Sequence, residues 1–526
     1  MSFCSPFPDV EIPAVSLTEL VLADAVQDRP ALIDGVSGQV ITYDRLRILV
    51  NRVAGALAAR GVGKGDVVAV FAPNTPYYAV VFHGILRAGA AATTVNSLYT
   101  PHDIADQLRN SGARLLFTVS AFLDRAAAAT GQPGVAIETV VLDGASGYSS
   151  LADLLAQNAT APEVSIDPAT DLAVLPYSSG TTGHPKGVML THRNIVANLA
   201  QCQPLLQVDQ DTRVLAVLPF FHIYGMVVLM NLGLWSGATV VTLPKFDLEL
   251  FLRTIQEHRT DRVYIAPPVA LALAKHPMVD DFDLSAMKFL FSGAAPLDAE
   301  LAEAVRARLG CKIRQGYGMT ELSPVSHAIP MDRDDISVGS VGFTLPNMEC
   351  KLVDPETGQE VGEGRLGELW CRGPNVMLGY LHNAEATAAT LDAEGYLHTG
   401  DVAMVDADGV VTIVDRVKEL IKYKGYQVPP AELEALLLTH PKIADVAVIG
   451  VRDADGEEVP KAFVVRQPGA DDLTGADVMA FVAAQVSPHK KVRAVQFIDQ
   501  IPKSAAGKIL RKDLRAVEPA VEPAAT

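Results

Sequence analysis

The sequence predicts an α/β protein with a large N-terminal body and a small α+β domain at its C-terminal end. Over about the first 330 residues, short apolar runs alternate with amphipathic helical patterns, which favours parallel strands joined by crossover helices. Beyond residue 337, short extended runs alternate with Gly, Pro and Asp turns, which is typical of a small β-rich subdomain. We therefore expect two α/β sheets and a β-rich subdomain, followed by a small mobile domain.

Apolar residues at three- and four-residue spacing mark the predicted helices. In residues 42–57, Leu46, Val50 and Val53 share one face with Leu57, and Gly61 ends the pattern. Further helices are expected at residues 76–86, 102–109, 191–199, 248–258, 298–309 and 475–485, and one begins near Pro430. Strands are expected at residues 67–71, 91–95, 114–119, 172–175, 214–217, 238–243, 262–265, 288–291, 444–450, 462–466 and 494–498.

Three segments follow from these changes of pattern. We expect an N-terminal domain at residues 1–415 and a mobile C-terminal domain at residues 416–516. Residues 517–526 belong to the low-complexity end AVEPAVEPAAT, which predicts a disordered tail.

Composition excludes several classes of partner. The chain has 43 Lys and Arg against 61 Asp and Glu, a net charge of -18, so we expect no nucleic acid and no anionic membrane surface as partners. The N-terminus lacks the basic and apolar regions of a secretory signal, and the longest apolar run, 223–235, is shorter than the roughly 18 residues of a membrane span. Five scattered cysteines without a C-x-x-C pair indicate neither a disulfide framework nor a zinc site, which favours the cytoplasm.

Residues 177–188, YSSGTTGHPKGV, form the most informative stretch of the chain. Its glycines let backbone N–H groups approach an anion, its hydroxyls add donors, and Lys186 adds a positive charge. The stretch follows a predicted strand and precedes a helix capped by Thr191. It is not a Walker A loop, because Gly187 rather than Ser or Thr follows the lysine. It predicts a phosphate-binding loop, although a plain turn has the same composition.

Four further stretches carry polar or glycine residues that a plain α/β body does not require. His222 lies among aromatic residues in PFFHIYG and is either a buried core histidine or a functional one. SGAAPL (292–297) and QGYGMTE (315–321) follow strand-like runs, where open α/β sheets bind ligands. Glu321 is a candidate Mg²⁺ ligand or a solvated turn residue. YLHTGD ends in Asp401, a carboxylate suited to a ribose diol or an ordinary turn residue.

In this order the stretches resemble the adenylate-forming superfamily of acyl-CoA synthetases, luciferases and adenylation domains, and most of all the 4-coumarate–CoA ligases. Residues 415–434, DRVKELIKYKGYQVPPAELE, are similar to the family's interdomain hinge, and residues 502–514, PKSAAGKILRKDL, to its C-terminal lysine loop. The resemblance covers nearly the whole chain. It implies that residues 1–415 bind ATP and the acyl group, while residues 416–516 supply a catalytic lysine and contacts to coenzyme A.

The resemblance also implies the reaction. A carboxylic acid attacks the α-phosphate of ATP to give acyl-AMP and pyrophosphate, and the thiol of coenzyme A then displaces AMP. The expected partners are therefore a small-molecule carboxylic acid, ATP, Mg²⁺ and coenzyme A, bound by a monomer or homodimer. The small domain is expected to swing about Lys418 between the two half-reactions.

Each expected role falls on named residues. The resemblance implies catalytic roles for Thr182, Lys186, His222, Glu321 and Lys508, with Glu321 as the metal ligand. It implies ATP or AMP contacts for Ser178, Ser179, Gly180, Thr181, Thr182, Gly183, Lys186, Gln315, Gly316, Tyr317, Thr320, Asp401, Arg416, Lys418, Lys422 and Lys508. Coenzyme A contacts are implied for Lys245, Lys424 and Gly425, and an acyl pocket for His222, Ile223, Tyr224, Val228, Phe291, Ala294 and Gly316.

The acid itself stays open at this stage. Plant hydroxycinnamate ligases commonly carry a small polar residue where this chain has Val228, and a missing hydrogen-bond partner weakens preference for a phenol hydroxyl. Cinnamate-like acids, other aryl acids and medium- or long-chain fatty acids are all candidates. Alternatives to a coenzyme A ligase are a freestanding adenylation enzyme that loads a carrier protein and a nucleotide-binding regulatory module without catalysis.

Overall fold

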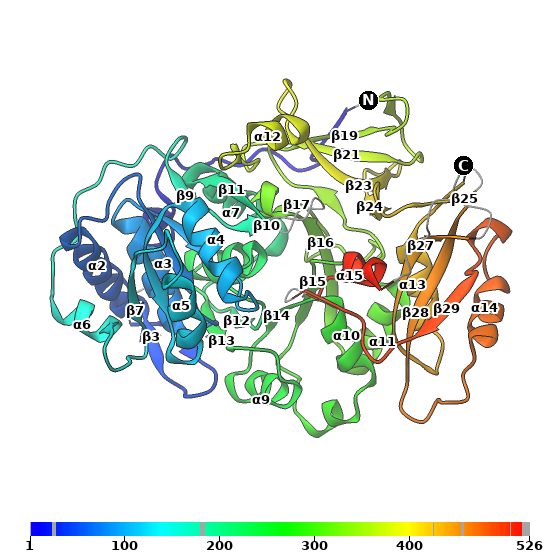
Figure 1. Cartoon of the computed structure of the whole chain (residues 1–526), viewed down its shortest axis with the longest axis horizontal. Coiled ribbons are helices and arrows are strands. Elements are labelled where there is room, and N and C mark those ends of the chain that lie inside the picture. Colours follow the sequence, from blue (N-terminus) through cyan, green and yellow to red (C-terminus); the bar gives the residue numbers. More distant parts are fainter. Residues whose placement is uncertain are drawn as a thin grey trace. The chain divides into compact units, whose positions relative to one another are not determined.

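The fold is that of a computed structural model (Figure 1), which describes residues 2–23, 28–178, 185–423, 426–453, 457–504 and 507–517. The chain forms two compact units. The larger unit comprises Cys4–Glu349 and Cys371–Leu397; the smaller comprises Cys350–Trp370 and the chain from His398 onwards, with Ser2 and Phe3. The division predicted at residue 416 stays a prediction, because the smaller unit also takes in β-rich segments before that residue.

The first sheet of the larger unit is mostly parallel, as the alternation predicted. Strands β9, β5, β4, β6, β7 and β8 run parallel, and β11 pairs antiparallel with β9, β10 and β22. In sheet order the strands are β10 (Tyr177–Ser178), β11 (Lys186–Thr191), β9 (Leu172–Val174), β5 (Ala91–Thr94), β4 (Val67–Phe71), β6 (Ala113–Thr118), β7 (Glu138–Val141) and β8 (Ser149–Ser150), with β22 (Gly379–Tyr380) beside β11. Strands β4, β5, β6 and β9 agree with predicted ones, whereas β7, β8, β10, β11 and β22 were not predicted.

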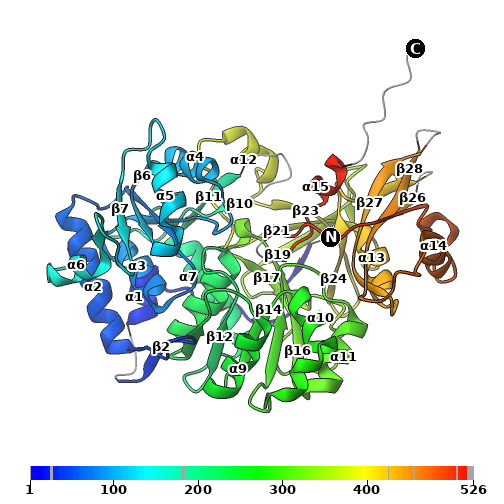
Figure 2. The same cartoon turned by 60° about the horizontal axis from the view of Figure 1, so that its bottom comes forward.

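Helices cover this sheet (Figures 1 and 2). On one face, α4 and α5 share a buried core with Ala69, Phe71 and Leu116 of the sheet. Helix α3 contacts β4 and β5 and packs against α2. The Thr42 side chain caps the N-terminus of α2. The helices are α2 (Tyr43–Ala59), α3 (Pro76–Arg87), α4 (Pro101–Ser111), α5 (Leu123–Thr130) and α6 (Leu151–Ala156), with a 3₁₀ turn η1 (Ser120–Phe122) before α5.

The second sheet also has a parallel centre. Its order is β18 (Phe343–Thr344), β17 (Val325–Ala328), β16 (Lys312–Gly318), β15 (Phe289–Ser292), β14 (Arg262–Ile265), β12 (Arg213–Ala216), β13 (Thr239–Thr242), β2 (Pro30–Asp34) and β3 (Val40–Thr42). Figure 2 shows its helices α9 (Leu248–His258), α10 (Pro267–Lys275) and α11 (Ala299–Leu309). The 3₁₀ turn η3 (Pro277–Asp281) follows α10 in the chain. Strand β2 was not predicted, because its pairing with β13 joins segments about 200 residues apart.

Helix α7 (His192–Leu206) contacts strands of both sheets, namely β9 and β11 of the first and β17 of the second. It begins after the predicted cap, Thr191, whose hydroxyl accepts from the Asn194 N–H at 3.2 Å. Twelve of its residues are buried, which is why its pattern lacks a broad polar face. Beside it lie α1 (Leu17–Leu22), a π-helical segment η2 (Gly225–Asn231) and α8 (Leu232–Trp235).

Three amide side chains on α7 form a buried polar row. Asn194, Asn198 and Gln201 are spaced by four and three residues, which places them on one helix face. Asn194 donates to the carbonyls of Pro374 and Val376, at 2.9 and 2.8 Å. Together with the contacts of Asn198, these bonds reach the segments that carry β17 and β22.

Asn198 bonds both backbone groups of Val325: its Nδ2 donates to the carbonyl at 2.7 Å, and its Oδ1 accepts from the N–H at 3.1 Å. Gln201 Nε2 donates to the Pro346 carbonyl at 2.8 Å. Asn375 extends the network, since its Nδ2 donates to the Leu322 carbonyl at 2.8 Å. The row therefore ties irregular backbone of the larger unit to a rigid helix.

The smaller unit contains the β-rich sheet that the turn pattern predicted. The sheet order is β1 (Ser2–Cys4), β19 (Glu349–Val353), β21 (Gly367–Arg372), β23 (Leu397–Val405) and β24 (Val411–Arg416), with β20 (Glu360–Val361) beside β19. The YLHTGD stretch, which by itself suggested a turn, lies mainly on β23. Its side chains alternate between buried and partly buried positions because the stretch is paired with β24.

The C-terminal part of the smaller unit is an α+β sandwich around β27 (Ile443–Arg452), β28 (Glu458–Arg466) and β29 (Ala494–Phe497). Val446 and Val448 face a core shared with α13 and α14, whereas Ala447 and Ile449 face a second core that includes Leu514 of α15. The remaining elements are β25 (Ile421–Tyr423), β26 (Tyr426–Val428), α13 (Pro430–Leu438), α14 (Gly475–Ala483), η5 (Pro488–Lys490) and α15 (Arg511–Ala516). The expected tail, apart from Val517, lies outside the described residues.

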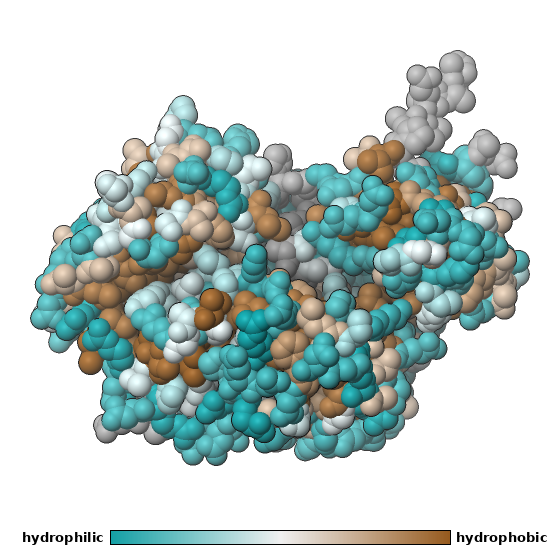
Figure 3. Space-filling model, turned by 90° about the horizontal axis from the view of Figure 1, so that it is seen from below, coloured by the Kyte–Doolittle hydropathy of each residue, from teal (hydrophilic) through white to brown (hydrophobic). Residues whose placement is uncertain are grey.

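The surface agrees with the polar composition. On the face drawn in Figure 3, apolar residues gather in separate clusters between hydrophilic ones. Among the helices that the structure describes, none is long and apolar enough to cross a membrane. The apolar run at 223–235 forms the buried segments η2 and α8 instead.

The polar row predicts a stability effect. We expect Asn198→Ala to lower the free energy of unfolding by about 2–3 kcal/mol, because it leaves the buried Val325 N–H without its acceptor. Asn51→Ala, on the exposed surface of α2, should change stability by less than about 0.5 kcal/mol. Urea unfolding followed by circular dichroism measures both, and equal losses would contradict a special role for the row.

Candidate active site

Two antiparallel strands enclose the predicted phosphate loop. Tyr177 pairs with Gly187 and Ser178 pairs with Lys186, so the stretch that we predicted as a loop at 177–188 begins and ends in strands. Its last residues form ladder bonds because β11 continues into pairs with β9 and β22. The predicted residues Ser179, Gly180, Thr181, Thr182 and Gly183 lie outside the described residues.

Glu321 is the centre of a buried polar cluster in the larger unit. It lies on the 3₁₀ turn η4 (Thr320–Leu322) and is 5% exposed. Its Oε1 accepts hydrogen bonds from Ser178 Oγ at 3.0 Å and from the Tyr380 hydroxyl at 2.9 Å. Lys186 Nζ lies 4.6 Å from the centre of the Tyr380 ring. The fold therefore brings together the predicted residues Ser178, Lys186 and Glu321.

Sequence reasoning missed Tyr380. The residue lies about 60 positions from Glu321 in the chain and reaches it because β22 pairs with β11, Val188 opposite Tyr380. Burial raises the pKa of the Tyr380 hydroxyl, and the Glu321 charge adds to the rise. The hydroxyl therefore stays protonated and donates to the carboxylate. No spacing rule connects these two residues, so only the strand pairing identifies Tyr380.

The cluster fits Mg²⁺ that arrives with a nucleotide. Within the described residues there is no group of three or more His, Cys, Asp or Glu side chains that could hold a metal alone. Mg²⁺ commonly binds one or two carboxylates together with phosphate oxygens and water. Glu321, a buried carboxylate oriented by two hydroxyl donors, is the residue that would hold it.

The predicted adenine segment is part of a strand rather than a loop after one. Strand β16 continues through Gly318 because it pairs first with β15 and then, from Gly316, with β17. The Gln315 side chain is buried and holds neighbouring loops: its Oε1 accepts from the Leu297 N–H at 2.5 Å, and its Nε2 donates to the Val338 carbonyl at 2.8 Å. Tyr317 and Thr320 are half-buried. Nucleotide contacts of this segment stay a prediction.

The predicted acyl-pocket residues form an aromatic cluster. The Tyr224 hydroxyl donates to the Phe291 carbonyl at 3.4 Å. A Cβ on Gly316 would lie 2.7 Å from Phe291 Cζ, and one on Gly293 would lie 2.9 Å from Tyr224 Cε1. Glycine is thus required at both positions because the rings occupy the space of a side chain.

Other pocket residues lie around this cluster. Ile223 and Val228 are buried near Tyr224 in sequence, and the His222 ring nitrogen Nδ1 accepts from the Tyr224 N–H at 3.4 Å. Ala294 is exposed and has a φ of +70°. Tyr264, which sequence reasoning missed, packs 5.7 Å from Phe291 between ring centres, and its buried hydroxyl has no hydrogen-bond partner among the described residues.

The smaller unit carries the predicted ribose and lysine residues. Asp401 and Arg416 face each other on β23 and β24, and their charged groups lie 3.1 Å apart. Asp401 is 6% exposed, so its carboxylate is held in a nearly dry position. This pair joins two residues to which the family resemblance gave nucleotide contacts, Asp401 in YLHTGD and Arg416 in the hinge segment.

Lys508 belongs to the same unit and is half-buried. Burial lowers the pKa of Lys508 to about 8, the Arg416 charge contributes to this fall, and the Asp401 charge opposes it. A buried ammonium in this setting favours pairing with an anion, because an approaching phosphate replaces the solvation of the charge that burial removes.

The predicted coenzyme A residues are only partly described. Lys245 is exposed after β13, and Lys424 and Gly425 lie outside the described residues. Lys422 on β25 is exposed and lies 3.8 Å from Glu356. Lys418 lies between β24 and β25. The structure therefore leaves the coenzyme A contacts as a prediction.

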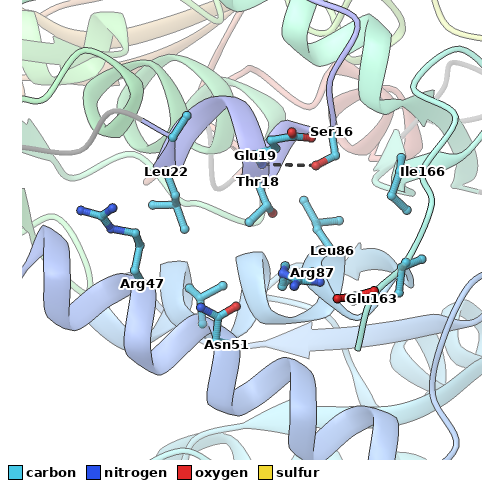
Figure 4. A pocket seen from close by; sticks show the side chains of 13 residues that line it. Ser16, Thr18, Glu19, Leu22, Arg47, Asn51, Leu86, Arg87, Glu163 and Ile166 are labelled. Atoms are coloured by element: carbon cyan, nitrogen blue, oxygen red, sulfur yellow. Dashed lines mark hydrogen bonds between the residues drawn. The ribbon is translucent and has the colours of Figure 1, made fainter. Parts of the chain in front are cut away.

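The larger unit also has a separate cavity of about 460 Å³ (Figure 4). Side chains of α1 and α2 line it, with Leu86 and Arg87 at the end of α3 and a segment around Glu163. Ser16 caps α1 at its edge by accepting from the Glu19 N–H at 3.2 Å. None of the residues predicted for catalysis or binding lines this cavity.

The chain matches two known domains. Residues 22–381 match the family described as AMP-binding enzyme, and residues 432–508 match the AMP-binding enzyme C-terminal domain. The chain belongs to the AMP-binding enzyme family. The match confirms the family that the order of motifs indicated.

Curated relatives and solved structures agree. The chain is 42% identical to 4-coumarate–CoA ligase 3 of Oryza sativa subsp. japonica, over 98% of this chain and 94% of that protein. It is 41% identical to a 4-coumarate–CoA ligase of Pinus taeda, over 97% of each. The anthranilate CoA ligase AuaEII in complex with anthranoyl-AMP matches with a TM-score of 0.89 at 28% identity, covering 96% of this chain and 97% of that one. ATP-bound MatB from Rhodopseudomonas palustris matches with a TM-score of 0.86 at 31% identity, over 95% and 99%.

The Glu321 cluster predicts a dependence on its charge. We expect Glu321→Gln to lower acid-dependent pyrophosphate release by about 10²-fold or more, because the amide accepts the same hydroxyl donors but binds Mg²⁺ poorly. Glu303→Gln, on the exposed face of α11, is the control and should leave the rate unchanged. Normal release by Glu321→Gln, with Mg²⁺ below saturation, would refute the assignment.

The environment of Lys508 predicts a pH effect. If the ammonium serves acyl-AMP formation, that half-reaction should fall as pH rises through about 8, since the charged form exists below the pKa. Lys508→Arg keeps a charge at all these pH values and should remove the alkaline limb. Stopped-time pyrophosphate assays between pH 6.5 and 10 measure both, and an alkaline limb that persists in Lys508→Arg would contradict the prediction.

Proposed function

We propose that this chain activates an aryl acid of the hydroxycinnamate kind and transfers it to coenzyme A. Its family and curated relatives make it an ATP-dependent, AMP-forming acid–CoA ligase. The observation that supports the aryl acid is the identity of about 42% to 4-coumarate–CoA ligases over nearly the whole chain, together with an aromatic cluster at the predicted acyl pocket. Anthranilate and benzoate CoA ligases among the similar structures fit the same proposal.

In the first half-reaction, a carboxylate oxygen of the acid bonds to the α-phosphorus of ATP, and the bond from that phosphorus to pyrophosphate breaks. Negative charge builds on the phosphate oxygens in this step. We assign Lys186, Lys508 and the predicted loop donors to offset it, and Glu321 to hold the Mg²⁺ that shields the phosphates. Asp401 and Arg416 are assigned to the ribose.

In the second half-reaction, the thiol sulfur of coenzyme A attacks the acyl carbon, and AMP leaves with the bonding electrons. Pyrophosphate has already departed, so this step needs no charge at the former β- and γ-phosphates. We assign Lys245, Lys424 and Gly425 to coenzyme A and His222 to the entrance of the acyl site. The Lys508 charge is expected to serve the first step alone.

The acyl site determines the expected preference among acids. Tyr224, Phe291 and Tyr264 form an aromatic cluster, and an aryl ring packs well on such faces. Val228 adds a buried apolar side chain where a polar one would bond a phenol. We therefore propose that unsubstituted or methoxylated cinnamates are used at least as well as 4-coumarate.

Cellular setting forms a further part of the proposal. We place the enzyme in the cytoplasm, supported by the buried free thiols of Cys202 and Cys311 and by an acidic composition without a basic face. We propose a monomer or homodimer.

A panel of acids tests the function. Purified enzyme with ATP and Mg²⁺ is given cinnamate, 4-coumarate, benzoate, octanoate or palmitate, and pyrophosphate release and thioester formation are measured with coenzyme A or a carrier-protein thiol. We expect the highest kcat/KM for a cinnamate with coenzyme A. A preference for fatty acids would overturn the aryl proposal, thioester only on the carrier would overturn coenzyme A, and no release with any acid would favour a regulatory module.

Position 228 gives a prediction about specificity. We expect Val228→Ser to raise the ratio of kcat/KM for 4-coumarate over cinnamate by about fivefold, since one hydrogen bond contributes about 1 kcal/mol net. Val227→Ser is the neighbouring control, buried on the same helical segment. An unchanged ratio in Val228→Ser would show that residue 228 does not face the ring.

A further inference from the structure

A short hairpin in the smaller unit carries Lys508. The Ser504 N–H donates to the Lys508 carbonyl at 2.8 Å, and the Leu510 N–H donates to the Pro502 carbonyl at 2.9 Å. Lys503 and Ile509 form an antiparallel bridge between the two legs. The position of the Lys508 ammonium therefore depends on the contacts that hold the two legs of the hairpin, residues 502–504 and 508–510.

Arg511 holds the second leg, three residues after Lys508. Its Nη2 donates to both carboxylate oxygens of Glu434 at 2.7 Å, and its Nε donates to the Val448 carbonyl at 3.2 Å. Glu434 lies on α13 and is itself oriented, because its Oε1 accepts from the Val448 N–H at 2.8 Å. One guanidinium thus connects the start of α15 to helix α13 and to strand β27.

The first leg has a weaker attachment. Lys503 Nζ lies 2.6 Å from Asp445 on β27, but both side chains keep about a quarter of their surface exposed, at 25% and 27%. The Arg511 and Glu434 side chains are 13% and 10% exposed. Because water screens a charge pair less when it is buried, the Arg511–Glu434 pair constrains the hairpin more strongly.

A buried ion pair is a poor means of stabilising a fold. Removing two charges from water costs several kcal/mol, and well-packed apolar side chains of similar volume are often as stable. The planar guanidinium, however, accepts only a narrow set of positions when it bonds a carboxylate and a carbonyl together. The Arg511–Glu434 pair therefore fixes the position of the hairpin more than it stabilises the fold.

We propose that Arg511, oriented by Glu434, is a positioning residue that sets the place of Lys508 for acyl-AMP formation. The proposal rests on the proposed function, in which Lys508 acts in the first half-reaction. We assign Arg511 no contact with a substrate, because its guanidinium bonds Glu434 and the Val448 carbonyl. It acts through the hairpin, so its loss should affect the half-reaction that needs Lys508 and leave the other.

The experiment measures the two half-reactions separately in Arg511→Met, Arg511→Lys and the double variant Glu434→Gln/Arg511→Met. The first assay is pyrophosphate release from ATP and acid; the second is thioester formation from preformed acyl-AMP and coenzyme A. The double variant removes both charges, and its amide keeps an acceptor for the Val448 N–H, so no buried charge is left alone. Its melting temperature should lie close to that of the wild type.

We expect Arg511→Met and the double variant to lose about 10²-fold in the first assay, since a displacement of about 1 Å can cost that much. The second assay should stay within about twofold of the wild type, because the Lys508 charge is expected to serve the first step alone. Arg511→Lys keeps the charge without the planar fork and should recover only part of the rate. The matched control, Glu432→Gln/Lys490→Met, removes another ion pair of α13 that does not hold the hairpin, and should change neither assay.

Two results would overturn the proposal. One is a double variant that has both the melting temperature and the first half-reaction rate of the wild type. The Arg511–Glu434 pair would then serve only to stabilise the fold. The other is an equal loss of both half-reactions in a variant that melts normally.

A second readout does not depend on turnover. The pH midpoint for labelling Lys508 with acetic anhydride, mapped by peptide mass spectrometry, reports the charges around its ammonium, namely Arg416, Asp401, Glu419 and Arg511. Arg511→Met should move this midpoint to higher pH, because a nearby positive charge is removed. If the wild type releases no pyrophosphate with any acid, the proposed function fails. The labelling midpoint then tests by itself whether Arg511 positions Lys508, and an unchanged midpoint in Arg511→Met would overturn that proposal.

Discussion

The buried amide row on α7 is the constraint on which the larger unit depends. Asn194, Asn198 and Gln201 bond backbone groups of Pro374, Val376, Val325 and Pro346, and buried groups of this kind cost about 1–3 kcal/mol each when left unpaired. Those groups belong to segments beside η4 and β22. The helix therefore determines where Glu321 and Tyr380 lie, although it contributes no side chain to their cluster.

Charge in this protein is local. The chain carries a net charge of -18, yet the residues assigned to phosphate chemistry include Lys186, Arg416 and Lys508. Two of them lie beside a group that limits their mobility: Lys186 over the Tyr380 ring and Arg416 on the Asp401 carboxylate. An acidic protein can bind anions in this way because a few oriented cations at short range outweigh a distant, screened surface charge.

Much of the fold could be read from the sequence because its determinants are local. Strand β4 and helix α9 have the predicted bounds, and Thr191 caps α7 as expected, since hydrophobic period and capping chemistry act over a few residues. The interpretation was wrong where pairing between distant segments decides the structure. YLHTGD and QGYG lie on strands, and the phosphate loop is shorter than its composition indicated, because partners elsewhere in the chain complete their ladders.

The same division applies to the candidate site. The sequence by itself determined the family and the reaction class, because these depend on short motifs in a recognisable order. The same motifs supplied the residues proposed for phosphate, ribose and the catalytic lysine. Only the tertiary structure decided that Tyr380 joins Glu321, that Tyr264 supports the acyl cluster and that Arg511 bonds Glu434. These contacts join residues 27 to 77 positions apart, the shortest from Tyr264 to Phe291 and the longest from Glu434 to Arg511. No local pattern encodes such a contact, since it exists only when packing brings the two segments together.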